Sequence, residues 1–109
     1  MIEAIVGSEG AERVLLFLAA RNSRYPREIA NTWSMDVSTV QNQLLRMERD
    51  GLLVSRTVGR TRLFEFNPRY AFKNEVKALL NKALAQLPPG VQEQLILHRK
   101  RPRRTGKTL

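Results

Sequence analysis

The sequence contains no cysteine and a single histidine, His98. Without thiols the chain cannot form disulfides, thiolate metal sites or a cysteine nucleophile, and one imidazole provides neither a zinc-binding pair nor a catalytic triad. No apolar run approaches the roughly 18 residues of a membrane-spanning helix, and residues 1–6 lack the pattern of a secretory signal. We therefore expect a cytoplasmic protein with no metal, no other cofactor and no membrane partner.

Acidic residues are also scarce relative to basic ones. The 109 residues include 19 Lys and Arg against 10 Asp and Glu, which gives a net charge of +9 and a pI near 11.1. Such a balance indicates a polyanionic partner, above all nucleic acid. An enzyme is disfavoured, because no nucleophile with a histidine base, no paired buried carboxylates and no glycine-rich phosphate loop can be recognised.

Much of the excess positive charge lies at the C-terminal end. Residues 98–109 carry six basic residues and no acid, together with Pro102 and Gly106. This composition predicts a basic tail that is disordered when free. The tail either adds sequence-independent affinity for nucleic acid through counterion release or is a solvated end.

Three helices are predicted in the first half of the chain. Ser8 is placed to cap the first helix, whose apolar run 14–20 indicates a buried central element. Pro26 fits the first position of a second, short helix. Asp36 is placed to cap the third through the amide of residue 38 or 39, and Gly51 to end it in the left-handed conformation. Its inward stripe has helical spacing and comprises Val40, Leu44 and Met47.

After Gly51 the apolar period changes from about 3.6 to 2. Residues 53–58 and 61–66 flank Gly59-Arg60, which predicts a β-hairpin with a type II′ turn and with Leu53 opposite Phe66. Asn67-Pro68 is typical of a helix start. A long amphipathic helix is then predicted up to the Pro88-Pro89-Gly90 segment, followed by a short helix over 91–97. The apolar stripe of the long helix comprises Phe72, Val76, Leu79, Leu80, Ala83, Leu84 and Leu87.

The order of these elements and four short motifs resemble the winged helix-turn-helix domain of bacterial transcription regulators of the ArsR and MarR types. The resemblance covers residues 12–67, and its motifs are residues 28–30, 35–40, 44–53 and 59–60. It implies a mainly α fold with a small β-hairpin, consisting of a winged helix-turn-helix domain (1–67), a C-terminal dimerisation helix segment (68–97) and the basic tail (98–109). The cysteine motif of many metal-sensing ArsR-type proteins is missing, so metal sensing is not expected.

This resemblance implies that the third helix enters the major groove of double-stranded DNA, where amides can pair with adenine and guanidinium groups with guanine. The predicted base-reading residues are Ser38, Thr39, Gln41, Asn42 and Arg46. Wing and backbone contacts are predicted for Arg56, Arg60, Arg62, Arg24 and Arg27, with Arg60 suited to a minor groove. The alternative for each group is an ordinary solvated helix face or a charged edge strand.

The predicted function is a sequence-specific, homodimeric repressor that binds an inverted repeat and associates with the nucleoid. The alternative for the long helix is that its stripe packs only on its own domain; we expect that it also pairs with the first helix and residues 2–6 of a second copy, through the stripe given above. The sequence shows no obvious ligand pocket and identifies no small-molecule effector. The alternatives are a protein-interaction adaptor or antitoxin-like partner and a non-specific nucleic-acid binder driven by the tail.

Overall fold

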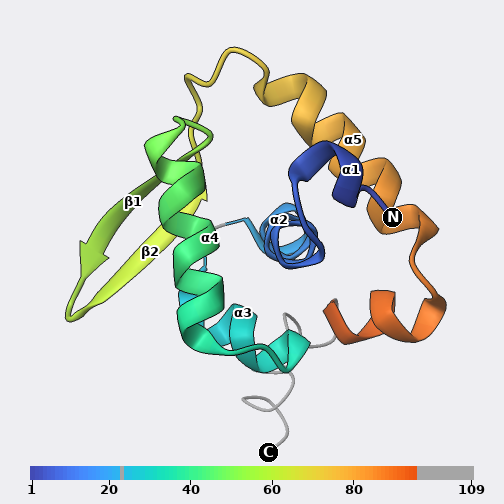
Figure 1. Ribbon diagram of the computed structural model, residues 1–109, viewed down its shortest axis with the longest axis horizontal. Coiled ribbons are helices and arrows are strands. Elements are labelled where there is room, and N and C mark those ends of the chain that lie inside the picture. The colour runs from blue at the N-terminus through green and yellow to red at the C-terminus, as the bar shows by residue number, and fades with distance from the viewer. Residues whose placement is uncertain (23, 96–109) are drawn as a thin grey trace, which may run out of the picture.

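The computed structural model describes residues 1–22 and 24–95 of the chain, shown in Figure 1. The helices are α1 (Glu3–Val6), α2 (Glu9–Arg21), α3 (Pro26–Trp33), α4 (Val37–Arg49) and α5 (Lys73–Gln86), and the strands are β1 (Leu53–Val58) and β2 (Thr61–Phe66). Residues 89–95 are also helical. The predicted mainly α fold with one β-hairpin is therefore confirmed.

Helix α2 is the centre of the core. Figure 1 looks along its axis and shows the other helices arranged around it. Its residues 14–18 are at most 3% exposed, as the all-round apolar run predicts, and it packs against α1, α3, α4 and α5. The Ser8 hydroxyl accepts a hydrogen bond from the Ala11 amide at 3.1 Å, so the predicted cap is confirmed.

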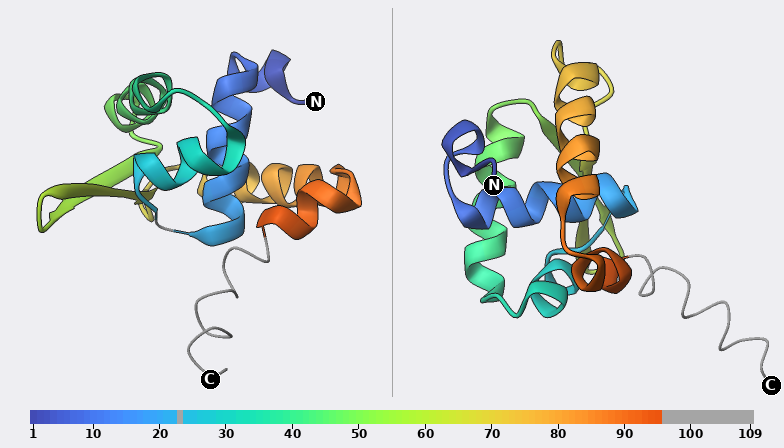
Figure 2. Two further views of the ribbon diagram at one scale, coloured as in Figure 1. Left: turned by 90° about the horizontal axis from the view of Figure 1, so that it is seen from below. Right: turned by 90° about the vertical axis from the view of Figure 1, so that its right-hand side faces the viewer.

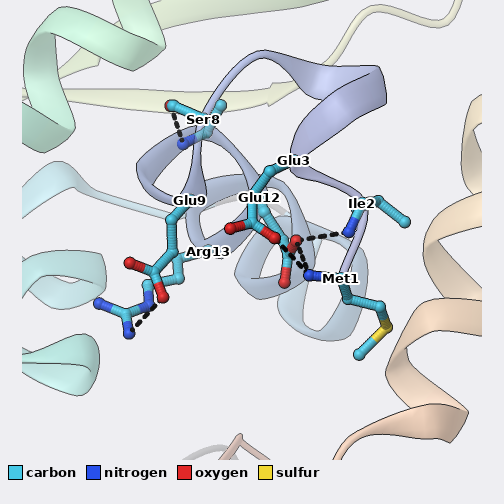
Figure 3. Close-up of polar contacts among 8 residues, drawn as sticks. Met1, Ile2, Glu3, Ser8, Glu9, Glu12 and Arg13 are labelled. Atoms are coloured by element: carbon cyan, nitrogen blue, oxygen red, sulfur yellow. Dashed lines mark hydrogen bonds and ion pairs between the residues drawn. The ribbon is translucent and has the colours of Figure 1, made fainter.

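The N-terminal residues are held against α2 of their own chain (Figure 3). The buried Glu12 carboxylate accepts a hydrogen bond from the Ile2 amide at 2.7 Å and lies 3.0 Å from the Met1 ammonium. Hydrogen bonds to Glu3 and Glu12 raise the pKa of that ammonium above its usual value. Ile2 is buried. Residues 2–6, which we expected to meet a second copy, thus include a side chain of this chain's own core.

The end of α4 and the hairpin follow the predicted geometry. Gly51 has φ +89°, and the amides of Gly51 and Leu52 donate to the carbonyls of Glu48 and Met47, which is the Schellman arrangement. The strands pair antiparallel with Leu53 opposite Phe66. Gly59 has φ +64° whereas Arg60 does not have a positive φ, as a type II′ turn requires. Figure 2 (left) shows the hairpin projecting away from the helices.

The expected helix start at Asn67-Pro68 is wrong. Asn67 accepts a hydrogen bond from the Arg69 amide and donates its side-chain amide to the Gly51 carbonyl, so it ties a turn to the end of α4. A second turn is closed by the bond from the Lys73 amide to the Tyr70 carbonyl, and α5 begins only at Lys73. Phe72 consequently lies at the N-cap of α5 and is 61% exposed.

The chain after α5 returns to the core. Leu95, in the helical residues 89–95, is buried, and its carbonyl accepts a hydrogen bond from the Arg21 side chain at 2.8 Å. Arg21 is itself buried at the end of α2, where its guanidinium lies over the Phe17 ring. The last two residues of the helix predicted over 91–97, and the tail 98–109, lie outside the described residues.

Candidate nucleic-acid interface

Helix α4 presents one apolar and one polar face, as the sequence predicts. Val40, Leu44 and Met47 are at most 3% exposed and pack into the core beneath it. The opposite face is exposed to solvent and carries Ser38, Thr39, Gln41 and Asn42. A helix held from behind, with short polar groups in front, is what insertion into a major groove requires.

The start of α4 differs in detail from the expected cap. Asp36 occupies the N-cap position with an extended backbone, but its side chain caps no amide. Its carboxylate instead accepts a hydrogen bond from the Ser38 hydroxyl at 2.7 Å. The carboxylate is thereby engaged by a hydroxyl, and both side chains remain exposed at the tip of the helix.

Arg46 does not lie with the other predicted base-reading residues. It is half-buried, and its guanidinium donates to the Gln43 side chain at 2.9 Å and to the Val6 carbonyl at 3.5 Å. Val6 ends α1, which packs against α2 and lies on the opposite side of α4 from the hairpin (Figure 1). Arg46 thus links α4 to α1, because the short N-terminal helix, which the sequence pattern did not reveal, supplies a carbonyl within its reach.

The arginines of the hairpin divide into two kinds. Arg56 and Arg60 are exposed and form no ion pair among the described residues, with Arg60 at the tip. Arg62 turns back toward α4: its Nη2 lies 3.5 Å from Glu48 Oε1, and its Nε donates to the Ser55 hydroxyl at 3.0 Å. Ser55 in turn donates to Glu48. This three-residue network connects the hairpin to α4.

The two arginines near the start of α3 also differ. Arg27 is exposed. Arg24 is half-buried, and its Nε lies 3.6 Å from Glu28 Oε2. The Arg24 backbone forms an antiparallel bridge with Phe64, in which each amide donates to the other's carbonyl at 3.0 Å. Sequence reasoning missed this bridge; the nearest signal was Pro26, which restricts Tyr25, the residue after Arg24, to the extended backbone that the structure has there.

A cavity of about 440 Å³ separates α4 from the hairpin. Its charged lining residues are Arg27, Arg60 and Arg62, and no acid lines it. Gln41 of the exposed face of α4 opens into the same cavity. The region between helix and hairpin is therefore concave and positively charged, which suits a negatively charged backbone.

The stripe of α5 expected to face a second copy packs largely within the chain. Leu80 and Ala83 are buried, whereas Val76, Leu79, Leu84 and Leu87 are partly buried against the same core. Helix α5 crosses α2, which accepts this apolar face (Figures 1 and 2). Phe72, the remaining member of the stripe, points out of that core from the turn before α5. The structure therefore does not assign this stripe to a dimer interface.

The described part of the chain has no cluster of three or more His, Cys, Asp and Glu side chains that could hold a metal ion. Within the same residues, no helix is both long and apolar enough to cross a membrane.

The sequence matches no protein-family model and no curated protein sequence. The fold, in contrast, matches solved structures. A probable transcriptional regulator from Pseudomonas aeruginosa is 20% identical, with a TM-score of 0.55 over 93% of this chain and 84% of that one. MepR, a transcription regulator of a Staphylococcus aureus multidrug efflux pump, is 16% identical, with a TM-score of 0.58 over 97% and 84%.

A MarR-family transcriptional regulator from Silicibacter pomeroyi is also 16% identical, with a TM-score of 0.59 over 99% of this chain and 78% of that one. All three neighbours are described as transcriptional regulators, the first as a probable one and the third as a member of the MarR family. The chain thus has a winged-helix fold of the MarR-like kind, and the structural matches do not support the ArsR-like resemblance.

Proposed function

We propose that this chain is a sequence-specific DNA-binding transcriptional regulator whose helix α4 enters the major groove. The observation that carries the proposal is the exposed polar face of α4 beside a projecting, arginine-bearing hairpin. The proposal is also supported by the solved structures of similar fold, which are described as transcriptional regulators.

In this proposal each element has a distinct role. Gln41 and Asn42 carry side-chain amides, which can pair bidentately with an adenine edge. The Thr39 hydroxyl accepts or donates at a neighbouring base, whereas Ser38, whose hydroxyl donates to Asp36, accepts. Arg60 at the hairpin tip enters the adjacent minor groove, where the negative potential is concentrated. Arg27 and Arg56 contact phosphates, which position the protein without reading sequence.

The other three predicted arginines have intramolecular contacts that modify their proposed roles. Arg62 can bind a phosphate only if it gives up its ion pair with Glu48. It therefore contributes less to the affinity for DNA than an arginine without an ion pair. Arg24 and Arg46 support the interface by holding α3 and α1 in place.

We further propose that the protein acts as a homodimer on an inverted repeat and represses by occluding a promoter. A single winged domain buries only about 600–1,000 Å² on DNA and reads few base pairs, so two half-sites about 34 Å apart provide the specificity that a genome requires. A cytoplasmic, nucleoid-associated location follows from this role.

The proposal is tested by selecting bound duplexes from a random DNA pool with the full chain at near-physiological salt. We expect an enriched sequence, with two-fold symmetry if the protein binds as a dimer. Lys82→Ala removes one positive charge from the exposed side of α5, away from the proposed interface. This variant serves as a control and should select the same sequence. A pool that shows no enrichment would contradict sequence-specific binding.

A further inference from the structure

Leu45 is an apolar residue on the polar side of α4. It is 41% exposed, whereas its neighbour Leu44 is completely buried. Leu45 does not belong to the core or to the residues packed against it. A single exposed leucine is unremarkable in itself, so what matters is the cavity into which this one opens.

The cavity between α4 and the hairpin combines two kinds of surface. Arg27 and Arg60 supply positive charge without an ion pair among the described residues, Arg62 adds a guanidinium that is paired with Glu48, and Leu45 lies in the lining with the apolar side chains of Val37 and Phe64. A ligand that complements both surfaces carries negative charge and an apolar group close together. Duplex DNA has both features, because its phosphates flank a major groove in which thymine alone presents a methyl group.

Leu45 follows Gln41 by four residues and therefore lies on the same face of the helix. Four residues advance about 6 Å along a helix, which corresponds to about two base-pair steps of 3.4 Å. The two side chains also line the same cavity. A helix that places Gln41 at one base edge thus brings Leu45 to a base one or two steps away.

We propose that Leu45 is a specificity-determining residue that packs against the C5-methyl group of a thymine in the bound sequence. This inference rests on the proposed function, since it requires α4 to lie in a major groove. It assigns to Leu45 an apolar form of base recognition that adds to hydrogen bonding by Gln41 and Asn42.

The test uses the duplex enriched from the random pool, with each thymine replaced singly by deoxyuridine, which lacks only the methyl group. For the full wild-type chain we expect one position in each half-site at which this replacement lowers affinity about fourfold, the equilibrium equivalent of burying one methyl-sized group. In Leu45→Ala the penalty at that position should vanish. Leu45→Met, which keeps an apolar side chain, should restore part of it.

Gln41→Ala is the matched control, because it alters the same cavity and leaves Leu45 in place. This variant should bind more weakly and still lose affinity at the same deoxyuridine. An enriched sequence without any methyl-sensitive thymine, or an unchanged penalty in Leu45→Ala, would overturn the role of Leu45 and leave the proposed function standing. Failure to enrich any sequence would instead remove the proposed function and this inference with it.

Discussion

Replacing Arg60 by alanine should reduce the salt dependence of DNA binding. Arg27, Arg56 and Arg60 are exposed and without an ion pair among the described residues. If each neutralises the charge of one phosphate, Arg27 and Arg56 by contact and Arg60 from within the minor groove, the slope of log K against log salt is about −2.7 per protomer, or about −5.4 for two protomers. Between 50 and 200 mM salt these slopes correspond to losses of about 40-fold and about 2,000-fold.

Arg60→Ala should therefore make the slope shallower by about 0.9 per protomer, and to the same extent on enriched and scrambled duplexes. The measurement is a fluorescence-anisotropy titration of the full chain at four or five salt concentrations. Any contribution of residues 98–109 is common to both proteins, so it cancels in the difference between slopes. Lys82→Ala removes the same charge from exposed α5 and should leave the slope unchanged. Equal slopes for Arg60→Ala and wild type would refute a phosphate or minor-groove contact at the hairpin tip.

Three further substitutions test the site and the fold. Asn42→Ala should lower the binding free energy by about 1–3 kcal/mol through the loss of discrimination at one base position, measured by competition with singly substituted duplexes. An equal loss of binding on scrambled DNA would contradict base reading by Asn42. Gly51→Ala should lower the free energy of unfolding in urea by about 1–2 kcal/mol, because Gly51 has φ +89°. No atom lies within 4 Å of the position that the new Cβ would take, so the cost is backbone strain and not a clash, and an unchanged midpoint would argue against it. Leu80→Ala should lower the free energy of unfolding by about 2–5 kcal/mol in the same assay, because Leu80 is fully buried where α5 packs on α2. A loss below about 1 kcal/mol would show that the two helices pack less tightly.

The elements set by local chemistry were predictable from the sequence. Three residues mark helix boundaries. Ser8 accepts a hydrogen bond from a free amide of the first turn, Pro26 has a fixed φ that suits the first helical position, and Gly51 tolerates the positive φ at a helix end. The hairpin register followed from the two-residue turn at Gly59-Arg60, since turn length fixes which residues face each other. The exposed face of α4 followed from its inward stripe.

The errors arose where one local pattern permits two tertiary arrangements. Asn67-Pro68 is compatible with a helix start, but the Gly51 carbonyl lies within reach of the Asn67 side chain, and the resulting hydrogen bond favours a turn. Arg46 lies only four residues from Asn42, which predicts the same side of α4, yet its guanidinium reaches the carbonyl of Val6 in α1. Gly51 is far in sequence from Asn67, and Val6 is far from Arg46. The local periodicity of the sequence therefore carried no information about these two contacts.

The apolar stripe of α5 shows the same ambiguity at the scale of the whole fold. A helix that packs on its own domain and a helix that pairs with a second copy bury the same spacing of residues. Here α2 covers Leu80 and Ala83, so a partner could reach them only by displacing the central helix. Apart from Leu45 and Val58, which belong to α4 and the hairpin, the exposed large apolar side chains among the described residues are Met1, Ile5 and Phe72, and only Phe72 belongs to the stripe. We therefore expect the proposed homodimer to pair through surface that is already exposed in the monomer, and not through the face of α5 that α2 covers.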